Sequence, residues 1–226
     1  MAGKIKRQRP APGAREVLYG FHPVMEALSA GRRTFFNLMV DRASLSERQA
    51  RVVELAEKRQ ISWQTQTSEQ IRRVCASDQH QGIAASVSPL PLHALESLVS
   101  RTAWHDGPCL LVLLDGILDP NNLGAIVRTA HCVGADALVV PKDRAVGATP
   151  AVSKASAGAL EHTRICRVTN LAATIQWLKT AGVWVAGLAA QADQSVFQAD
   201  LKGPLALIVG GEERGLRPLV RRHCDF

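Results

Sequence analysis

The sequence predicts an α/β protein in two parts: a small α/β domain, followed by a larger domain built on a parallel sheet. From residue 109 onward, short runs that are apolar throughout alternate with helical segments, which is typical of a parallel sheet covered on both faces. A shorter series of alternating helices and strands occupies residues 16–88. Proline and polar residues separate the two series over residues 89–108, so we expect a linker there.

The small domain is expected to follow the order α-β-α-β-α-β, which implies a compact α/β sandwich. Gly31 suits the left-handed end of the first helix, and Ser44 or Ser46 is available as the N-cap of the second. The apolar pattern predicts helices over residues 22–30, 46–60 and 68–76, and strands over residues 35–40, 61–63 and 82–87. The linker that follows is expected to contain one helical piece over residues 92–100.

The large domain, residues 109–226, is expected to carry its ligand-binding loops at one edge of the sheet. Ligands bind at the carboxyl ends of the strands in open parallel sheets. The pattern predicts strands over residues 109–114, 137–140, 164–168, 183–188 and 205–209, and helices over residues 123–133, 150–160, 171–181 and 217–222. The loops after strands 109–114 and 205–209 have unusual sequences and are therefore the candidates for a site.

Positive charge is concentrated at the amino end of the chain. The formal net charge is +7, yet residues 1–15 contain five bases and no acid, which leaves the rest of the chain nearly neutral. We expect a basic, disordered arm over residues 1–15, which favours a polyanionic partner such as nucleic acid. A merely solvated tail is the simpler alternative. An Arg-rich transit peptide is a third, although Pro10 and Pro12 interrupt any amphipathic helix there.

The cysteines and histidines do not suggest a metal centre. The five cysteines are too far apart for a C-x-x-C pair and the seven histidines are scattered, so we expect no metal. No secretory signal precedes the cysteines, which predicts reduced thiols in a cytoplasmic protein. The longest aliphatic run near the middle, residues 110–114, is far shorter than the about 20 residues of a membrane-spanning helix, so no membrane segment is expected.

Two loops contain the residues that we expect to form a site. Residues 115–124 read D-G-I-L-D-P-N-N-L-G and lead into a helix that carries Arg128. Taken alone, Asn122 would be an N-cap and Arg128 an exposed, salt-bridging arginine. Residues 210–215 read G-G-E-E-R-G, and such glycines allow the backbone to approach a ligand closely. Neither loop has the G-x-G-x-x-G or Walker A pattern, which argues against a nicotinamide dehydrogenase and an NTPase.

Together, the motifs resemble those of the SpoU/TrmH family of RNA ribose 2′-O-methyltransferases in the SPOUT superfamily. They are D-x-x-x-D-P-x-N-x-G-x-x-x-R over residues 115–128, P-K-D-R over 141–144, S-x-G-A-x-E over 156–161 and G-x-E-x-x-G over 210–215. Residues 19–24 and 80–82 are similar to a small RNA-binding domain that a subset of the family carries. The resemblance covers residues 17–225 and is strongest to members that methylate a guanosine of 23S ribosomal RNA.

The resemblance implies an enzyme that uses S-adenosyl-L-methionine to methylate a ribose 2′-hydroxyl of 23S rRNA. It also implies a homodimer and a catalytic domain with a deep trefoil knot, which is rare among protein folds. Residues 16–88 would then be the RNA-substrate-binding domain, and residues 109–226 the SPOUT methyltransferase domain.

The same resemblance assigns roles to individual residues. Arg128 matches a central catalytic arginine of the family. Because arginine stays protonated, we expect Arg128 to orient phosphate and hydroxyl and to stabilise developing negative charge, not to act as a base. Asn122 would position the ribose or Arg128, and Glu212 would hold an asparagine or arginine by hydrogen bonding. The cofactor-binding residues would be Leu188, Gly210 and Gly211.

Two departures from the family pattern leave alternatives open. Arg214 replaces a residue that is often small or acidic. A third family motif would begin after Phe226, so we expect a truncated chain without the knot-completing segment, which binds S-adenosyl-L-methionine weakly until about 15–30 residues are added. The alternative function is a non-catalytic RNA-binding protein or ribosome-assembly factor on the same scaffold. An α/β enzyme for another nucleotide is disfavoured by the absent phosphate-binding fingerprints.

Overall fold

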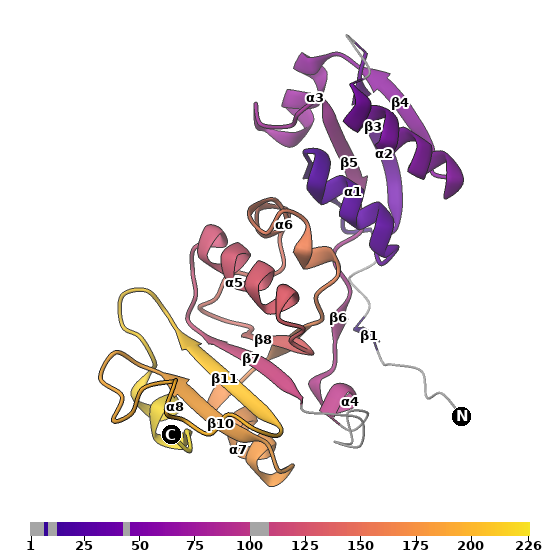
Figure 1. Cartoon of the computed structure of the whole chain (residues 1–226). Helices are drawn as coiled ribbons and strands as arrows, with labels where there is room; N and C mark the ends of the chain where they lie inside the picture. The colour runs from indigo at the N-terminus through magenta and orange to yellow at the C-terminus, as the bar shows by residue number, and fades with distance from the viewer. Residues whose placement is uncertain (1–6, 9–12, 43–45, 100–108) are drawn as a thin grey trace, which may run out of the picture.

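The chain forms two sheets, and each is the centre of one domain (Figure 1). The structure, a computed structural model, describes residues 7–8, 13–42, 46–99 and 109–226. The small domain, coloured indigo to purple, lies at one end of the molecule, and the large domain, coloured magenta to yellow, lies at the other. Within the described ranges, no helix combines the length and apolar character that crossing a bilayer would require.

A four-stranded sheet in the order β2-β5-β3-β4 organises the small domain. Helices α1 and α2 pack together on it, and their shared core includes Leu18, Val24, Leu38 and Val52. The elements are β2 (Glu16–Tyr19), α1 (Phe21–Ala30), β3 (Phe35–Asp41), α2 (Glu47–Lys58), β4 (Trp63–Gln66), α3 (Ser68–Cys75) and β5 (Ile83–Val87).

The six elements predicted for the small domain are present. One predicted strand begins later than expected, and the domain contains one further strand that was not predicted. Ser46 caps α2 through a capping box, and Gly31 ends α1 with a φ of 60°, which confirms both predicted caps. The strand predicted over residues 61–63 begins only at Trp63, because the chain is still leaving α2 at Gln60, where φ is 57°. The unpredicted strand is β2, which has four residues and buries only Leu18, too little for a periodic signal.

The large domain is built on a sheet in the order β1-β6-β9-β8-β7-β11-β10, with parallel pairing from β6 to β10. This arrangement confirms the predicted parallel α/β class. The edge strands are β1 (Arg7–Gln8) and β10 (Trp184–Leu188). The other elements are β6 (Leu92–His93), β7 (Leu110–Asp115), α5 (Pro120–Cys132), β8 (Ala137–Pro141), α6 (Pro150–Ala155), β9 (Ile165–Val168), α7 (Leu171–Thr180), β11 (Leu205–Gly210) and α8 (Pro218–His223).

The central strand β7 supplies apolar side chains to both faces of this sheet. Leu111 and Leu113 belong to the core that contains α7 and α8, whereas Val112 and Leu114 belong to the core that contains α5 and α6. The alternation arises because successive side chains of a strand point to opposite faces. Helices therefore cover both faces, as an uninterrupted apolar strand requires.

Two helix boundaries in the large domain differ from the prediction. Helix α5 begins at Pro120, three residues before the predicted start, because the Asp119 side chain caps it. Proline is favourable at the first helical position, since the backbone N–H that it lacks would have no partner within the helix. The helix predicted over residues 150–160 is divided into α6 and a short 3-10 helix, η1 (Ala159–Glu161). The division falls at Ala157 and Gly158, whose φ angles are 52° and 86°.

Part of the linker predicted over residues 89–108 is integrated into the large sheet. Residues 92–93 form β6, which pairs with β9 on one side and with β1 on the other. The helix predicted over residues 92–100 therefore begins later, as α4 (Leu95–Val99). The pairing of Arg7–Gln8 also differs from the disordered arm expected over residues 1–15. Residues 1–6, 9–12 and 100–108, which include other parts of these predictions, lie outside the described residues.

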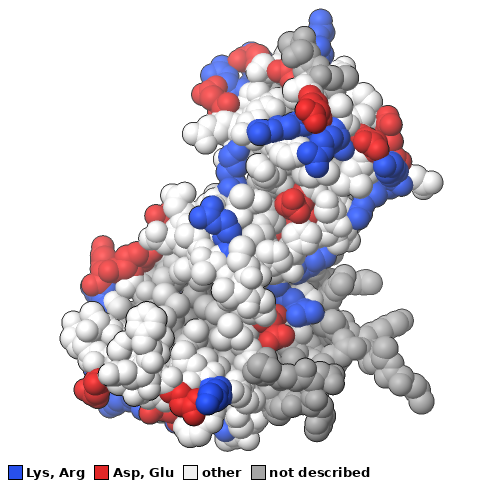
Figure 2. Space-filling model, viewed as in Figure 1, with Lys and Arg blue, Asp and Glu red and all other residues white. Residues whose placement is uncertain are grey.

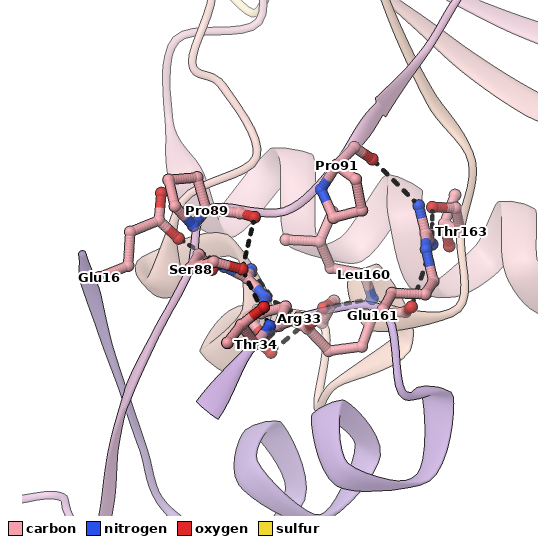
Figure 3. A network of polar contacts seen from close by, with 12 residues as sticks. Glu16, Arg33, Thr34, Ser88, Pro89, Pro91, Leu160, Glu161 and Thr163 are labelled. Carbon is pink, nitrogen blue, oxygen red and sulfur yellow. Dashed lines mark hydrogen bonds and ion pairs between the residues drawn. The ribbon is translucent and has the colours of Figure 1, made fainter. Parts of the chain in front are cut away.

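A buried ion pair joins the two domains (Figure 3). Arg33, which follows α1, donates from Nε to Glu161 Oε2 at 2.7 Å and from Nη2 to Glu161 Oε1 at 3.0 Å. Arg33 Nη1 donates to Glu16 Oε2 at 2.6 Å and to the carbonyl of Ser88 at 2.9 Å. Burial alone would lower the pKa of Arg33, but the hydrogen bonds and charges of Glu161 and Glu16 outweigh it and raise the pKa. The guanidinium of Arg33 is therefore protonated in spite of its burial.

The close packing of α5 on α6 generates a prediction about Gly124→Ala. Helix propensity alone would favour alanine by about 1 kcal/mol. A Cβ at Gly124 would lie only 2.4 Å from Cβ of Ala155 and 2.8 Å from its carbonyl carbon, so α6 would have to move. We expect the free energy of unfolding to fall by about 1–3 kcal/mol in urea denaturation. Thr129→Ala, at an exposed position of the same helix, should change it by less than about 0.5 kcal/mol. An equal effect of the two substitutions would contradict this packing.

Candidate active site

The carboxyl ends of β7 and β11 bring the two predicted loops together. These strands pair in parallel with Asp115 opposite Gly210, so the chain leaves both strands at the same edge of the sheet. The backbone N–H of Gly211 donates to the carbonyl of Asp115 at 2.9 Å. The loop 115–119 and the loop 211–217 are therefore in direct contact.

Asp115 and Arg217 hold the two loops against each other. The Asp115 side chain accepts from Arg217 Nε at 2.6 Å through Oδ1 and from the Arg217 backbone N–H at 2.8 Å through Oδ2. Asp115 is only 1% exposed, and a buried carboxylate needs such a partner. Sequence reasoning missed Arg217. The available signal was an aspartate directly after an apolar strand, which predicts a partner without identifying it.

The two loops need glycine because their backbones touch. A Cβ on Gly211 would lie 2.6 Å from the carbonyl oxygen of Gly116, and a Cβ on Gly210 would lie 2.2 Å from the carbonyl carbon of Gly215. Packing on the other loop therefore excludes a larger residue at Gly211, and the tight fold of the 210–215 loop on itself excludes one at Gly210. Their expected contact with a cofactor remains a prediction.

Asn122 and Glu212 meet where the loops converge. Asn122 Nδ2 donates to Glu212 Oε1 at 2.6 Å, and both residues are exposed. A carboxylate can only accept, so the amide NH₂ must face it, which leaves Asn122 Oδ1 available as an acceptor. The hydrogen bond from Asn122, followed by those from the loop backbone, holds the pKa of Glu212 below its usual value. Asn122 is not the N-cap of α5, since Asp119 takes that position and frees the Asn122 side chain.

Arg128 lies on the same helix but does not contact this pair. It follows Asn122 by six residues, which corresponds to about 9 Å along the helix axis. Arg128 is exposed, and the structure shows no hydrogen bond or ion pair from it to any described residue. Its guanidinium is therefore available to a ligand, as the sequence interpretation requires.

Leu188 lies in a separate groove beside the carboxyl end of β10. The groove is lined by the apolar side chains of Leu188, Leu207 and Leu216 and by polar residues of the loop after β10, including Gln194 and Ser195. Leu188 is 42% exposed. Gly210 and Gly211 are not among the lining residues, so the structure does not bring them into the groove of Leu188.

Two family models divide the chain as the structure does. The model described as the SpoU rRNA Methylase family matches residues 109–226, which is more than half of the chain. The model described as RNA 2′-O ribose methyltransferase substrate binding matches residues 17–93. The second match ends at β6, where the chain enters the large sheet.

Individual relatives match over nearly the whole chain. The chain is 38% identical to the 23S rRNA (guanosine-2′-O-)-methyltransferase RlmB of Ralstonia nicotianae over 211 residues, which cover 93% of this chain and 84% of the relative. It is 37% identical to RlmB of Coxiella burnetii over 92% of this chain and 83% of the relative. The fold is shared with the SpoU methyltransferase AviRb of Streptomyces viridochromogenes, solved with AdoMet, at a TM-score of 0.76 and 23% identity over 94% of this chain and 79% of AviRb.

The pKa of Glu212 provides a test of the Asn122 hydrogen bond. Because this bond is the main cause of the lowered pKa, Asn122→Ala should shift the titration of the Glu212 carboxyl to higher pH. The bond should be present above the pKa of Glu212 and lost as the pH falls through it. Carboxyl NMR across an acid titration measures this shift. The pKa of Glu54, which is lowered chiefly by a hydrogen bond from Lys58, should not move and serves as the control. An unmoved Glu212 titration would contradict the pairing.

Proposed function

Because the chain belongs to the SpoU rRNA methylase family, we infer that it is an RNA 2′-O-ribose methyltransferase that uses S-adenosyl-L-methionine. The substrate is a guanosine ribose of 23S rRNA, as in the named function of the RlmB relatives. The structural observation that carries the proposal is the contact between Asn122 and Glu212, because it joins two loops that come from separate strand ends.

The groove beside β10 fits the cofactor. The adenosine of the cofactor needs apolar walls with polar groups at the rim. Leu188, Leu207 and Leu216 supply such walls, and Gln194 and Ser195 supply polar groups. Leu188 would hold the cofactor there, while Gly210 and Gly211, at the neighbouring strand end, would present backbone toward it. When bound, S-adenosyl-L-methionine supplies a methyl group on a positively charged sulfur, which needs no further activation by a metal.

The residues of the chain would orient the ribose hydroxyl and handle its charge. The ribose 2′-hydroxyl would gain the methyl group that the cofactor supplies, and its proton would pass to solvent water. Asn122 Oδ1 can accept the hydrogen bond of the ribose hydroxyl, because Glu212 fixes which end of the amide faces it. Arg128 would bind the adjacent phosphate and stabilise negative charge on the oxygen, since arginine stays protonated.

The small domain would supply RNA affinity. Residues 17–93 match the substrate-binding model, and we assign rRNA contact to residues 16–88. On the face drawn in Figure 2, basic and acidic side chains are intermixed over this domain, with no single field of positive charge. Individual arginines would therefore contact phosphates while the basic segment 1–15 adds long-range attraction.

The remaining parts of the proposal concern assembly and location. A homodimer is supported by exposed apolar side chains on and after β10 and on α8, since such surfaces mark protein contacts. They include Trp184 at 56%, Leu219 at 50% and Phe197 at 95% exposure. The trefoil knot and a cytoplasmic location are proposed on the family membership.

The proposed activity is tested by the position of the transferred methyl group. The natural protein, incubated with unmodified 23S rRNA and S-adenosyl-L-methionine labelled in the methyl group, should place label on a guanosine 2′-oxygen. Nuclease digestion followed by nucleoside mass spectrometry identifies the product. Label on a base would overturn the reaction type. Stoichiometric rRNA binding without any label would instead support a non-catalytic assembly factor.

Arg128→Ala should abolish methyl transfer while leaving the fold intact. Arg128 is exposed and makes no hydrogen bond or ion pair with the described residues, so its loss should change the free energy of unfolding by less than about 0.5 kcal/mol. The matched control is Arg164→Ala, because Arg164 is also exposed but precedes β9 at the opposite edge of the sheet. Methyl transfer at the wild-type rate in the Arg128 variant would reject the assigned role.

A further inference from the structure

We propose that Arg33 is a positioning residue for methyl transfer: by pairing with Glu161, it fixes the substrate-binding domain on the methylase domain. RNA bound to the small domain is then presented at one set orientation to Asn122 and Arg128. This inference rests on the proposed function and adds to it a role for a residue far from both site loops.

The Arg33–Glu161 contact has the properties of an orienting device. Both side chains are essentially inaccessible, with exposures of 0% and 1%. Two parallel hydrogen bonds join the guanidinium to the carboxylate, a geometry that restrains rotation as well as distance. Ser153 Oγ donates to the same Glu161 Oε1 at 2.8 Å, so both carboxylate oxygens are engaged. A contact between apolar surfaces alone would allow the domains to slide.

Arg32 adds a second fixed contact to the same segment. Its Nη1 donates to the carbonyl of Glu161 at 3.0 Å and to the carbonyl of Thr163 at 2.7 Å. Its Nη2 donates to the carbonyl of Pro91, at the entry to the large sheet, at 3.3 Å. Two successive arginines of the small domain therefore hold both the segment after η1 and the connection between the domains.

Helix α1 also packs directly on the methylase domain. A Cβ on Gly158 would lie 2.6 Å from Cγ of Glu26 and 2.9 Å from the carbonyl of His22, so the interface is closed at this point. The Glu26 carboxylate lies 2.8 Å from His162 Nε2, and the His162 ring stacks on the His131 ring of α5. On the other side of the junction, Lys154 of α6 donates to the carbonyl of Gln79 at 3.0 Å.

This junction is continuous with the helix that carries the proposed catalytic residues. Ser153, bonded to Glu161, lies on α6. Helix α6 packs on α5 so closely that Gly124 has no room for a Cβ beside Ala155. Asn122 and Arg128 lie on α5 on either side of Gly124. The small domain is therefore held against the same rigid pair of helices that places Asn122 and Arg128.

Orientation matters because methyl transfer requires an in-line approach of the ribose oxygen to the methyl carbon. A displacement of about 1 Å can reduce the rate of an enzymatic reaction about 100-fold. RNA that touches both domains meets this requirement only if the domains keep a fixed relation. Loss of the Arg33–Glu161 contact should therefore lower turnover more than it lowers affinity.

The test uses Arg33→Met combined with Glu161→Gln. Removing Arg33 alone would leave the buried Glu161 carboxylate unpaired and could unfold the protein. The double variant neutralises both members of that pair and leaves only the partly exposed Glu16 without its partner. The matched control is Glu54→Gln, which breaks an exposed ion pair with Lys58 within the small domain. Arg33→Lys keeps the charge but loses the paired geometry, so it should give an intermediate result.

Two measurements are made, the first on a spin-labelled chain with altered cysteines and the second on the natural protein and the variants named above. Spin labels on the exposed native Cys132 of α5 and on the introduced thiol of Gln64→Cys in β4 report the distance between the domains, in a chain that also carries Cys75→Ser and Cys224→Ser. Steady-state methylation of a 23S rRNA transcript gives kcat, and equilibrium binding gives Kd for the transcript and for S-adenosyl-L-methionine. We expect the double variant to broaden the distance distribution and lower kcat at least about tenfold, with each Kd changed less than about threefold.

The proposal is overturned by an unchanged distance distribution, by a broadened one with wild-type kcat, or by a loss confined to rRNA affinity. The control Glu54→Gln should match the wild type in every measurement. A wild-type protein that binds the transcript but transfers no methyl group would refute the proposed function by itself. The distance measurement would still show in that case whether Arg33 fixes the domains.

Discussion

A carboxylate buried at the end of the central strand is the constraint on which the site depends. Asp115 is 1% exposed, and an unpaired charge at such a position costs several kcal/mol. Arg217 compensates it with both its guanidinium and its backbone N–H, although it lies about a hundred residues later in the chain. Satisfying this one group brings the loop after β11 onto the loop after β7. The glycine contacts and the Asn122–Glu212 hydrogen bond follow from that approach.

Glu161 forms the same kind of interaction between the domains. In each case, an acidic side chain lies beside a packed core and is paired with an arginine from a distant segment. The net stability that a buried ion pair adds is small, because desolvation offsets most of the attraction. The pair instead fixes the relative orientation of the two segments, since both charges are compensated in one arrangement only. One pair thus orients two loops, and the other orients two domains.

Local patterns were sufficient for the fold class but not for the contacts between distant segments. The five apolar strands of the large domain and the caps at Ser46 and Gly31 could be predicted, because each depends on neighbouring residues. The strands β2 and β6 could not, since they are short and are stabilised by partners elsewhere in the sequence. The roles of Asn122 and Glu212 were inferred from a family resemblance, and only the structure shows that their side chains meet. No local signal distinguishes the buried Arg33 from its exposed counterparts.

The motif at residues 156–161 shows why a recognised pattern does not by itself define a site. The Ser156 hydroxyl donates to the carbonyl of Ser153 and accepts from the backbone N–H of Leu160, so it shapes the turn between α6 and η1. Gly158 gives helix α1 room to approach, and Glu161 binds Arg33. These three residues shape the junction between the domains, and none of them forms a hydrogen bond with Asn122 or Glu212. Residues that mark the chain as a methyltransferase in sequence thus include residues whose contribution is to hold the substrate-binding domain in place.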